Sequence, residues 1–213
     1  MIPAFARFDL LSWLPRRQTL LTLLFVTAVG LILPVPGMAI IAAALATSLI
    51  VSTPFLGDER GRLDTLYGVL PVSRASVVAG RAVSLVVYYL LATGLATAAT
   101  VIVTALRGDR VPSSILLISL AAGAAFVGLA LALQMPVFFR VGYSRGRLMA
   151  YAPAFVIAGG AWLLQATGVH TLVLETLSGV PIAVVIAAGL GIGALGVLVA
   201  VSISTALYRT REL

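Results

Sequence analysis

The stretch GDERGRLDTLYGVLPVSRASVVAGR, residues 57–81, carries seven of the 21 Asp, Glu and Arg residues of this chain, and long apolar runs flank it on both sides. The whole chain of 213 residues is 61% hydrophobic and only 10% charged, with a mean hydropathy of +1.14. A soluble domain has about 25% charged and about 45–50% apolar residues. The composition therefore predicts an all-α integral membrane protein, because helices satisfy their own backbone hydrogen bonds in lipid.

Six apolar runs predict six transmembrane helices in a single domain over residues 1–213. The runs are residues 18–33, 35–55, 77–106, 113–139, 148–165 and 180–208. Since a spanning helix needs about 20 residues, the first run is marginal and the third, fourth and sixth must tilt, kink or project. Pro136 and Pro153 can each kink the helix that contains them. None of the Asp, Glu, Arg or His residues has to lie inside a span, which disfavours a proton- or sodium-coupled transporter.

The arginines are distributed unevenly among the connections between these runs. Twelve lie near the termini or in the second and fourth connections, against Arg107 and Arg110 in the others. The positive-inside rule then places both termini and residues 57–81 in the cytoplasm. The Arg-only, Ala/Gly/Val-rich composition points to a bacterial cytoplasmic membrane. Because the arginines flank apolar runs instead of forming one basic face, the net charge of +7 does not indicate nucleic-acid binding.

Two residue types are missing, and their absence excludes several functions. Without Cys the chain has no disulfide and no thiolate metal site, and without Lys it cannot form an ordinary P-loop ATPase. The single His170, with Glu175 nearby, is poor support for a metal or catalytic site, and no hydrolase motif is present. We expect no enzyme activity and no cofactor in this chain, so any ATP and Mg²⁺ would be bound by a separate subunit.

Residues 2–17 mix aromatic and aliphatic side chains with arginines. This mixture predicts a helix lying in the membrane interface, with its rings at headgroup depth. The alternative is the frayed start of the first span.

Within residues 57–81, apolar side chains recur with helical spacing. Leu63, Leu66, Tyr67 and Leu70 form one stripe of a helix. Asp58 is the expected N-cap, Pro71 ends the helix, and Ser73 can cap a third span that begins near Arg74. The segment, about residues 57–76, could be a loop helix that rests on lipid heads, or a docking helix for a cytosolic partner.

An acidic pair follows the second span, and after it come a helix, the residues LPVSR and a hydrophobic span with a basic residue at its head. This order resembles the ATP-binding-cassette (ABC) type-2 transporter permease family. The matching pieces are residues 58–60, Leu66, residues 70–74 and residues 77–81. The resemblance implies six spans, a cytoplasmic N-terminal interfacial helix, and a coupling helix that contacts a separate ATPase subunit. It also implies a dimer with a second permease copy or a paralogue. Permeases that export phenol-soluble-modulin peptides are similar in size and layout.

The predicted function is therefore the permease subunit of an ABC exporter that moves an amphipathic or hydrophobic peptide, lipid or drug. The alternative is a membrane scaffold or immunity protein that binds a peptide. The expected ATPase contacts are Asp58, Glu59, Arg60, Leu63, Leu66, Tyr67, Leu70 and Arg74.

Polar and small residues inside the spans could line a pathway or pack helices together. Thr93, Thr97, Thr100 and Thr104 recur on one face of the third span, and Gln134 precedes Pro136. Gly189, Gly193 and Gly196 form a small-residue strip in the sixth span, which indicates close packing within a subunit or between two. The apolar connection 166–179 is expected outside, where it could fold back into the outer leaflet.

Overall fold

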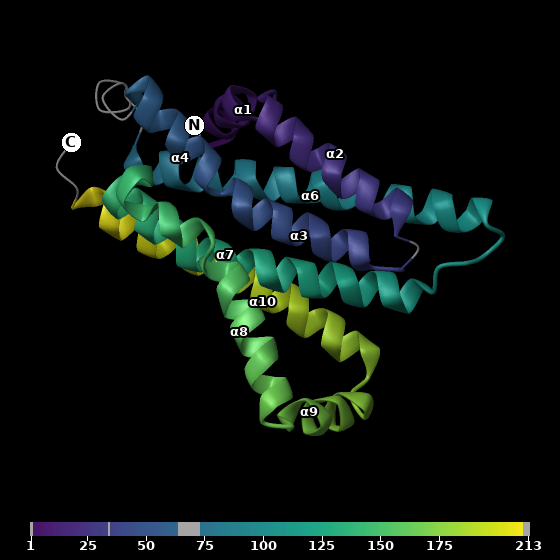
Figure 1. The fold of residues 1–213 in the computed structure, drawn as a ribbon. Coiled ribbons are helices and arrows are strands. Elements are labelled where there is room, and N and C mark those ends of the chain that lie inside the picture. The colour runs from purple at the N-terminus through teal and green to yellow at the C-terminus, as the bar shows by residue number, and fades with distance from the viewer. Residues whose placement is uncertain (1, 34, 64–72, 211–213) are drawn as a thin grey trace.

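The computed structural model describes residues 2–33, 35–63 and 73–210, and every regular element in these ranges is a helix (Figure 1). The elements are α1 (Ile2–Trp13), α2 (Arg17–Ile32), α3 (Met38–Ile50), α4 (Ser52–Gly61), α6 (Arg74–Leu106), α7 (Ser113–Gly146), the 3-10 helix η1 (Arg147–Ala150), α8 (Ala152–Ala166), α9 (Val169–Ser178) and α10 (Ile182–Arg209). The all-α prediction is confirmed for the described residues.

Four helical stretches in the described part of the chain are long and apolar enough to cross a membrane. They are Met38–Gly61, Arg74–Leu106, Ser113–Ala166 and Ile182–Arg209. The first predicted span corresponds to α2, which has only 16 residues, and the fifth corresponds to α8, which belongs to the 54-residue stretch with α7. Length and composition therefore support a membrane protein with four clear candidate spans.

The long helices lie side by side in one bundle. Figure 1 shows α2, α3, α6, α7 and α10 lengthwise, with α1 seen nearly end-on, so α1 lies across the bundle axis. α6 packs against α1, α2, α3 and α10, and α7 packs against α3, α4 and α10. α1 is thus a helix of its own, separated from α2 by a turn at Leu14, Pro15 and Arg16.

Contact between α7 and α10 depends on glycine. A Cβ atom on Gly193 would lie 2.7 Å from the carbonyl oxygen of Ala124, and one on Gly196 would lie 2.4 Å from the carbonyl carbon of Gly128. A Cβ on Gly189 would come within 2.8 Å of the carbonyl oxygen of Ala121. The small-residue strip of α10 therefore packs within the subunit, where the missing side chains let the two backbones touch.

The prolines do not act as the sequence predicts. In α7, whose residues are all described, the backbone leaves helical geometry at Gly142 (φ 79°, ψ 178°) and not at Pro136. Pro153 lies in the first turn of α8 instead of in the interior of a helix. The prediction of a kink at Pro153 is wrong because proline at this position lacks only an N–H that has no helical partner.

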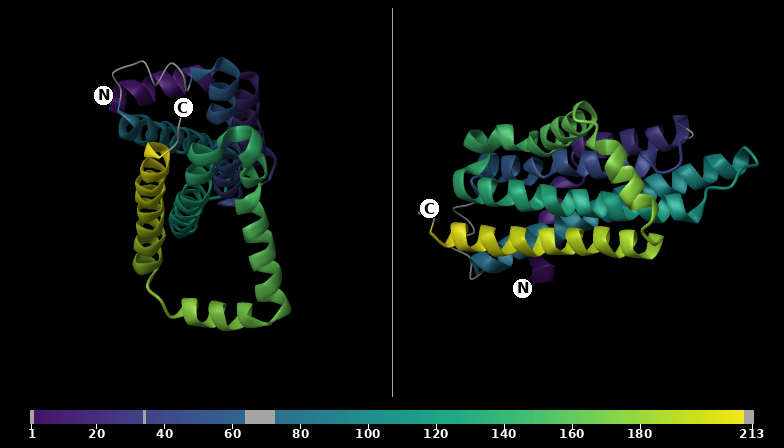
Figure 2. Two further views of the ribbon diagram at one scale, coloured as in Figure 1. Left: turned by 90° about the vertical axis from the view of Figure 1, so that its left-hand side faces the viewer. Right: turned by 90° about the horizontal axis from the view of Figure 1, so that it is seen from below.

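α8 and α9 stand away from the other helices (Figure 2). The chain turns at Gly168, which has a left-handed φ of 69°, and continues as α9 through the predicted outer connection. His170 lies in α9 with its ring Nδ1 atom 3.2 Å from the carbonyl oxygen of Leu164. Re-entry of this connection into a leaflet stays a prediction.

Candidate functional site

Most charged side chains of the described residues gather at one end of the bundle, on the left of Figure 1. We call it the charged end. It consists of α1, the ends of α4, α7 and α10, and the start of α6. The end of α4 and the start of α6 also flank residues 64–72, where Leu66, Tyr67 and Leu70 lie outside the described residues. The opposite end carries Arg107, Asp109 and Arg110 between α6 and α7.

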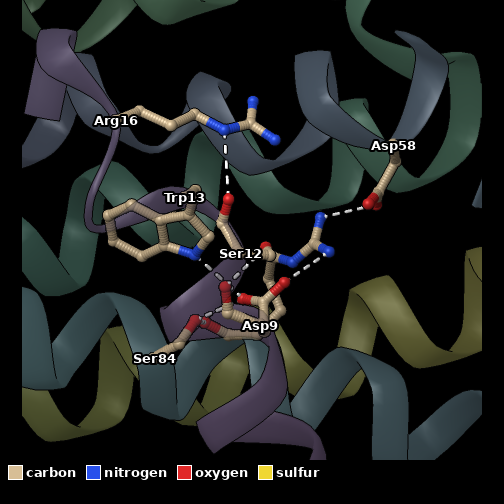
Figure 3. A network of polar contacts seen from close by, with 7 residues as sticks. Asp9, Ser12, Trp13, Arg16, Asp58 and Ser84 are labelled. Atoms are coloured by element: carbon tan, nitrogen blue, oxygen red, sulfur yellow. Dashed lines mark hydrogen bonds and ion pairs between the residues drawn. The ribbon is translucent and has the colours of Figure 1, made fainter. Parts of the chain in front are cut away.

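A buried arginine joins three helices at the charged end. The guanidinium of Arg81 in α6 lies 2.7 Å from the Asp9 carboxylate in α1 (Nη2–Oδ1) and 2.9 Å from the Asp58 carboxylate in α4 (Nη1–Oδ2). Arg81 is 0% exposed, Asp9 1% and Asp58 8%. In Figure 3, Asp9 and Asp58 point toward the space between them, which this guanidinium fills. The three residues form what we call the Arg81 cluster.

The Asp9 carboxylate has further donors around it. Ser84 donates its hydroxyl to Asp9 Oδ2 at 2.5 Å, and the indole N–H of Trp13 donates to the same oxygen at 3.3 Å. The Arg81 guanidinium also lies over the ring of Phe55, 4.8 Å from its centroid. Charged groups tolerate such burial only when paired and hydrogen-bonded, and removing one partner typically costs about 3–5 kcal/mol. The cluster therefore binds α1, α4 and α6 to one another firmly.

Two expectations about these residues are wrong. Asp58 is not an N-cap, because it lies in the last turn of α4, which ends at Gly61. The sequence did not require any arginine to lie inside a span. Arg81 nevertheless lies about two turns into α6, a candidate span, and is fully buried. Tertiary packing overrides the local signal here, since the helix that precedes Asp58 continues through it.

The sequence does contain a signal for the Arg81 cluster. Arg81 continues a buried stripe on α6 formed by Val77, Val78, Ser84, Leu85 and Tyr88. Asp9 likewise interrupts the buried stripe of Phe5 and Trp13 on α1. A lone charge on each of two apolar stripes, opposite in sign, is what a buried pair between two helices requires.

Glu59 ties α4 to the end of α7. Its carboxylate accepts the backbone N–H of Ser144 at 3.0 Å (Oε1) and the Ser144 hydroxyl at 2.5 Å (Oε2). The break at Gly142 turns the chain just before Ser144, so the N–H of Ser144 is available to Glu59 instead of an earlier α7 carbonyl. This contact joins the helix before residues 64–72 to α7.

Arg74 ties the start of α6 to the end of α10. Its Nη1 atom donates to the carbonyl oxygens of Tyr208 at 2.8 Å and Arg209 at 2.9 Å, and the guanidinium lies 5.5 Å from the centroid of the Tyr208 ring. A cation suits a helix C-terminus, where carbonyls lack helical partners. Ser73 caps α6 as predicted, because its hydroxyl accepts the N–H of Ser76 at 3.1 Å.

The other predicted contact residues at the charged end are placed differently. Arg60 is exposed in the last turn of α4. Leu63 is half-buried and packs against the core cluster. Among the expected ATPase contacts that the structure describes, Arg60 is therefore exposed, whereas the side chains of Asp58, Glu59 and Arg74 bind other helices of the same subunit.

Several polar residues inside the bundle donate to nearby carbonyls. Thr100 donates to the Ala96 carbonyl and Thr104 to the Thr100 carbonyl, both in their own helix. Thr93 is buried and Thr97 is half-buried on the same helix. Gln134 is fully buried, and its amide donates to the carbonyls of Met149 (3.2 Å) and Ala150 (3.0 Å) in η1. The Gln134 contacts hold the chain between α7 and α8 against α7.

Together these contacts attach α4 and α6, the two helices that flank residues 64–72, to the rest of the bundle. On one side, α4 is bound to α6 and α1 through Asp58 and to α7 through Glu59. On the other side, α6 is bound to α10 through Arg74 and to α1 through Arg81. A displacement of this segment would therefore be passed to α1, α6, α7 and α10.

Comparison with known proteins gives one match. A family model described as "ABC-2 family transporter protein" matches residues 9–209. No curated protein and no solved structure is similar enough to match. The matched range includes Asp9, Asp58 and Arg81, the three members of the Arg81 cluster.

Proposed function

Because the chain belongs to the ABC-2 family of transporter proteins, we propose that it is the permease subunit of an ABC exporter, powered by a separate cytosolic ATPase subunit. Its substrate is an amphipathic or hydrophobic molecule: a peptide, a lipid or a drug. The apolar helices carry few polar side chains, and those of Thr100 and Gln134 donate to nearby carbonyls, which favours such a substrate over an ion.

The proposed topology has six spans with both termini in the cytoplasm of a bacterial cell. In it α2 crosses the membrane, the stretch Ser113–Ala166 crosses twice as α7 and α8, the other three longer stretches each cross once, and the charged end faces the ATPase. The concentration of arginine at the charged end supports this orientation. The permease works as a dimer with a second copy or a paralogue.

One observation carries the proposal: α4 and α6, which flank residues 64–72, are both bound to other helices of the bundle. A partner that pushes on this segment moves α4 and α6, and the Asp58–Arg81 ion pair and the Glu59–Ser144 hydrogen bonds pass that movement on. Buried contacts transmit displacement well because close-packed interiors deform little. ATP-driven closure of the ATPase could thus open the path between helices.

Replacing Leu66 and Tyr67 by Asp tests the docking role of the segment. We expect loss of co-purification with the ATPase and normal membrane insertion, because acidic side chains would be buried against an apolar groove. Arg110→Asp adds an acidic residue at the opposite end and serves as the control. Full retention of the ATPase by the double variant would contradict the docking role.

ATP hydrolysis by the purified complex separates this proposal from a scaffold or immunity protein. A permease should stimulate hydrolysis by its ATPase, and substrate should change the stimulated rate. A scaffold that only binds a peptide would leave hydrolysis unchanged.

A further inference from the structure

Two adjoining cavities lie where the chain passes from α7 to α8. The first, of about 470 Å³, is lined by Arg147, Tyr143, Tyr151 and Ser52 among others, and we call it the headgroup cavity. The second, of about 630 Å³, is lined by Val137, Met149, Phe155 and Val156 among others, and we call it the acyl groove. Leu148 and Tyr151 line both, so the two cavities adjoin at these residues.

Several contacts fix the walls of these cavities. Glu59 binds Ser144 on one side of η1, and Gln134 binds the carbonyls of Met149 and Ala150 on the other. Arg147 and Tyr151 belong to this fixed stretch or adjoin it, so their backbone positions are set without a ligand. The site is therefore preformed at the charged end of a membrane-embedded bundle.

The chemistry of the two cavities differs. The headgroup cavity holds a guanidinium and phenol and serine hydroxyls, and no acidic residue lines either cavity in the described part of the chain. Glu59 is close in the fold, but its carboxylate is engaged by Ser144. The acyl groove is mostly apolar and open, with Phe155 73% and Val156 62% exposed, and Arg145 is the charged residue that lines it.

We propose that the two cavities together bind one anionic phospholipid. The phosphate sits at Arg147, which can donate two parallel N–H bonds to phosphate oxygens, and the hydroxyls of Tyr143 and Tyr151 donate beside it. An acyl chain follows Phe155 and Val156 along α8. Basic pockets between helices at the membrane surface suit anionic headgroups, and here the adjoining apolar groove selects a lipid over a free phosphate.

Native mass spectrometry of the purified full chain tests the lipid site. We expect phosphatidylglycerol to be retained about tenfold more strongly than phosphatidylcholine with identical acyl chains. Arg147→Gln should remove this preference, because losing a charged hydrogen bond weakens binding about tenfold or more. Arg147→Lys should keep part of it, and Arg110→Gln, at the opposite end, should keep all of it. Equal retention of the two lipids, or an unchanged preference in Arg147→Gln, would overturn the proposal.

Glycerol phosphate, a headgroup without acyl chains, distinguishes the two sources of phosphate. At millimolar concentration it should fail to displace phosphatidylglycerol, because it leaves the acyl groove empty. Displacement would overturn the assignment of the groove to a lipid chain. The assay contains no ATPase and no transported substrate, so its failure would leave the proposed export function standing.

Discussion

Arg81 in α6 and Asp9 in α1 form a buried ion pair with 2.7 Å between Nη2 and Oδ1. Asp9 belongs to a helix that lies across the bundle, and Arg81 to the helix that packs against most of the others (Figure 1). The pair therefore fixes the crosswise helix to the bundle at the level where α4 ends. Asp58 binds the other side of the same guanidinium, so α4 is joined to α1 and α6 through it.

Arg81→Leu should destabilise the protein strongly. It leaves two carboxylates buried without their cation, and breaking a buried pair in this way costs about 3–5 kcal/mol. A thermal melt followed by size-exclusion chromatography in detergent should show a clearly lower midpoint. Arg110→Leu removes an exposed arginine and should leave the midpoint unchanged. A midpoint equal to that of the unmodified chain would contradict the role of the cluster.

Asp9→Asn and Arg81→Gln should be coupled. Arg81→Gln alone leaves both the Asp9 and Asp58 carboxylates buried without their cation, and Asp9→Asn alone removes one of the two partners of Arg81, whereas the double variant leaves only Asp58 without its cation. The double variant should therefore lose less stability than the sum of the single losses, with an interaction free energy of about 1–3 kcal/mol. Additive losses would show that the two side chains do not interact.

Gly193→Leu should separate α7 from α10. A Cβ at Gly193 already lies 2.7 Å from the Ala124 carbonyl oxygen, so a larger side chain must push the backbones apart. Overpacking costs about 1–3 kcal/mol or more, and the melting midpoint should fall. Gly191→Leu is the matched control, since a Cβ there meets nothing within 4 Å. Equal effects of the two changes would refute close α7–α10 contact.

Glu59→Cys and Ser144→Cys should crosslink when introduced together. The native side chains are in hydrogen-bond contact, and the chain has no cysteine that could interfere. A short bifunctional thiol reagent should give an intramolecular link, visible as faster migration in a denaturing gel. Asp109→Cys with Ser144→Cys joins opposite ends of the bundle and should give none. Failure of the first pair would mean that α4 and α7 are apart at this end.

Arg74→Gln should loosen the end of α10. It removes the guanidinium that binds two terminal carbonyls, and because Arg74 is partly exposed we expect a cost of only about 1 kcal/mol. Amide hydrogen exchange near Tyr208 should become several-fold faster. Arg62→Gln changes an exposed arginine at the end of α4 and should leave this exchange rate unaltered. Unchanged exchange in Arg74→Gln would exclude the contact.

Much of the architecture could be predicted from local patterns. Apolar runs of spanning length predict helices because lipid leaves the backbone no other partner, and α6 begins at Arg74 after the Ser73 cap as expected. A helix within residues 2–17, observed as α1 over residues 2–13, followed from the mixed aromatic and charged composition of this segment. These features depend on residues close to one another in the chain.

Two of the errors concern contacts between distant segments. Asp58 looked like a helix start because its immediate neighbours permit one, and only the tertiary structure brings its carboxylate next to the Arg81 guanidinium of α6. Gly142, and not a proline, breaks α7, at the point where Ser144 meets Glu59 from another helix. A spacing rule along one helix cannot find such a partner.

By itself, the sequence determined that this protein is helical, that its helices are apolar enough for a membrane, and that its charges concentrate in a few connections. Hydrophobicity and backbone hydrogen bonding act locally, so they can be read along the chain. Only the tertiary structure decided that Asp9, Asp58 and Arg81 meet, and that glycines of α7 and α10 touch. Burial of a charge is stable only where opposite charges from other helices converge, and that convergence exists only once the helices are packed.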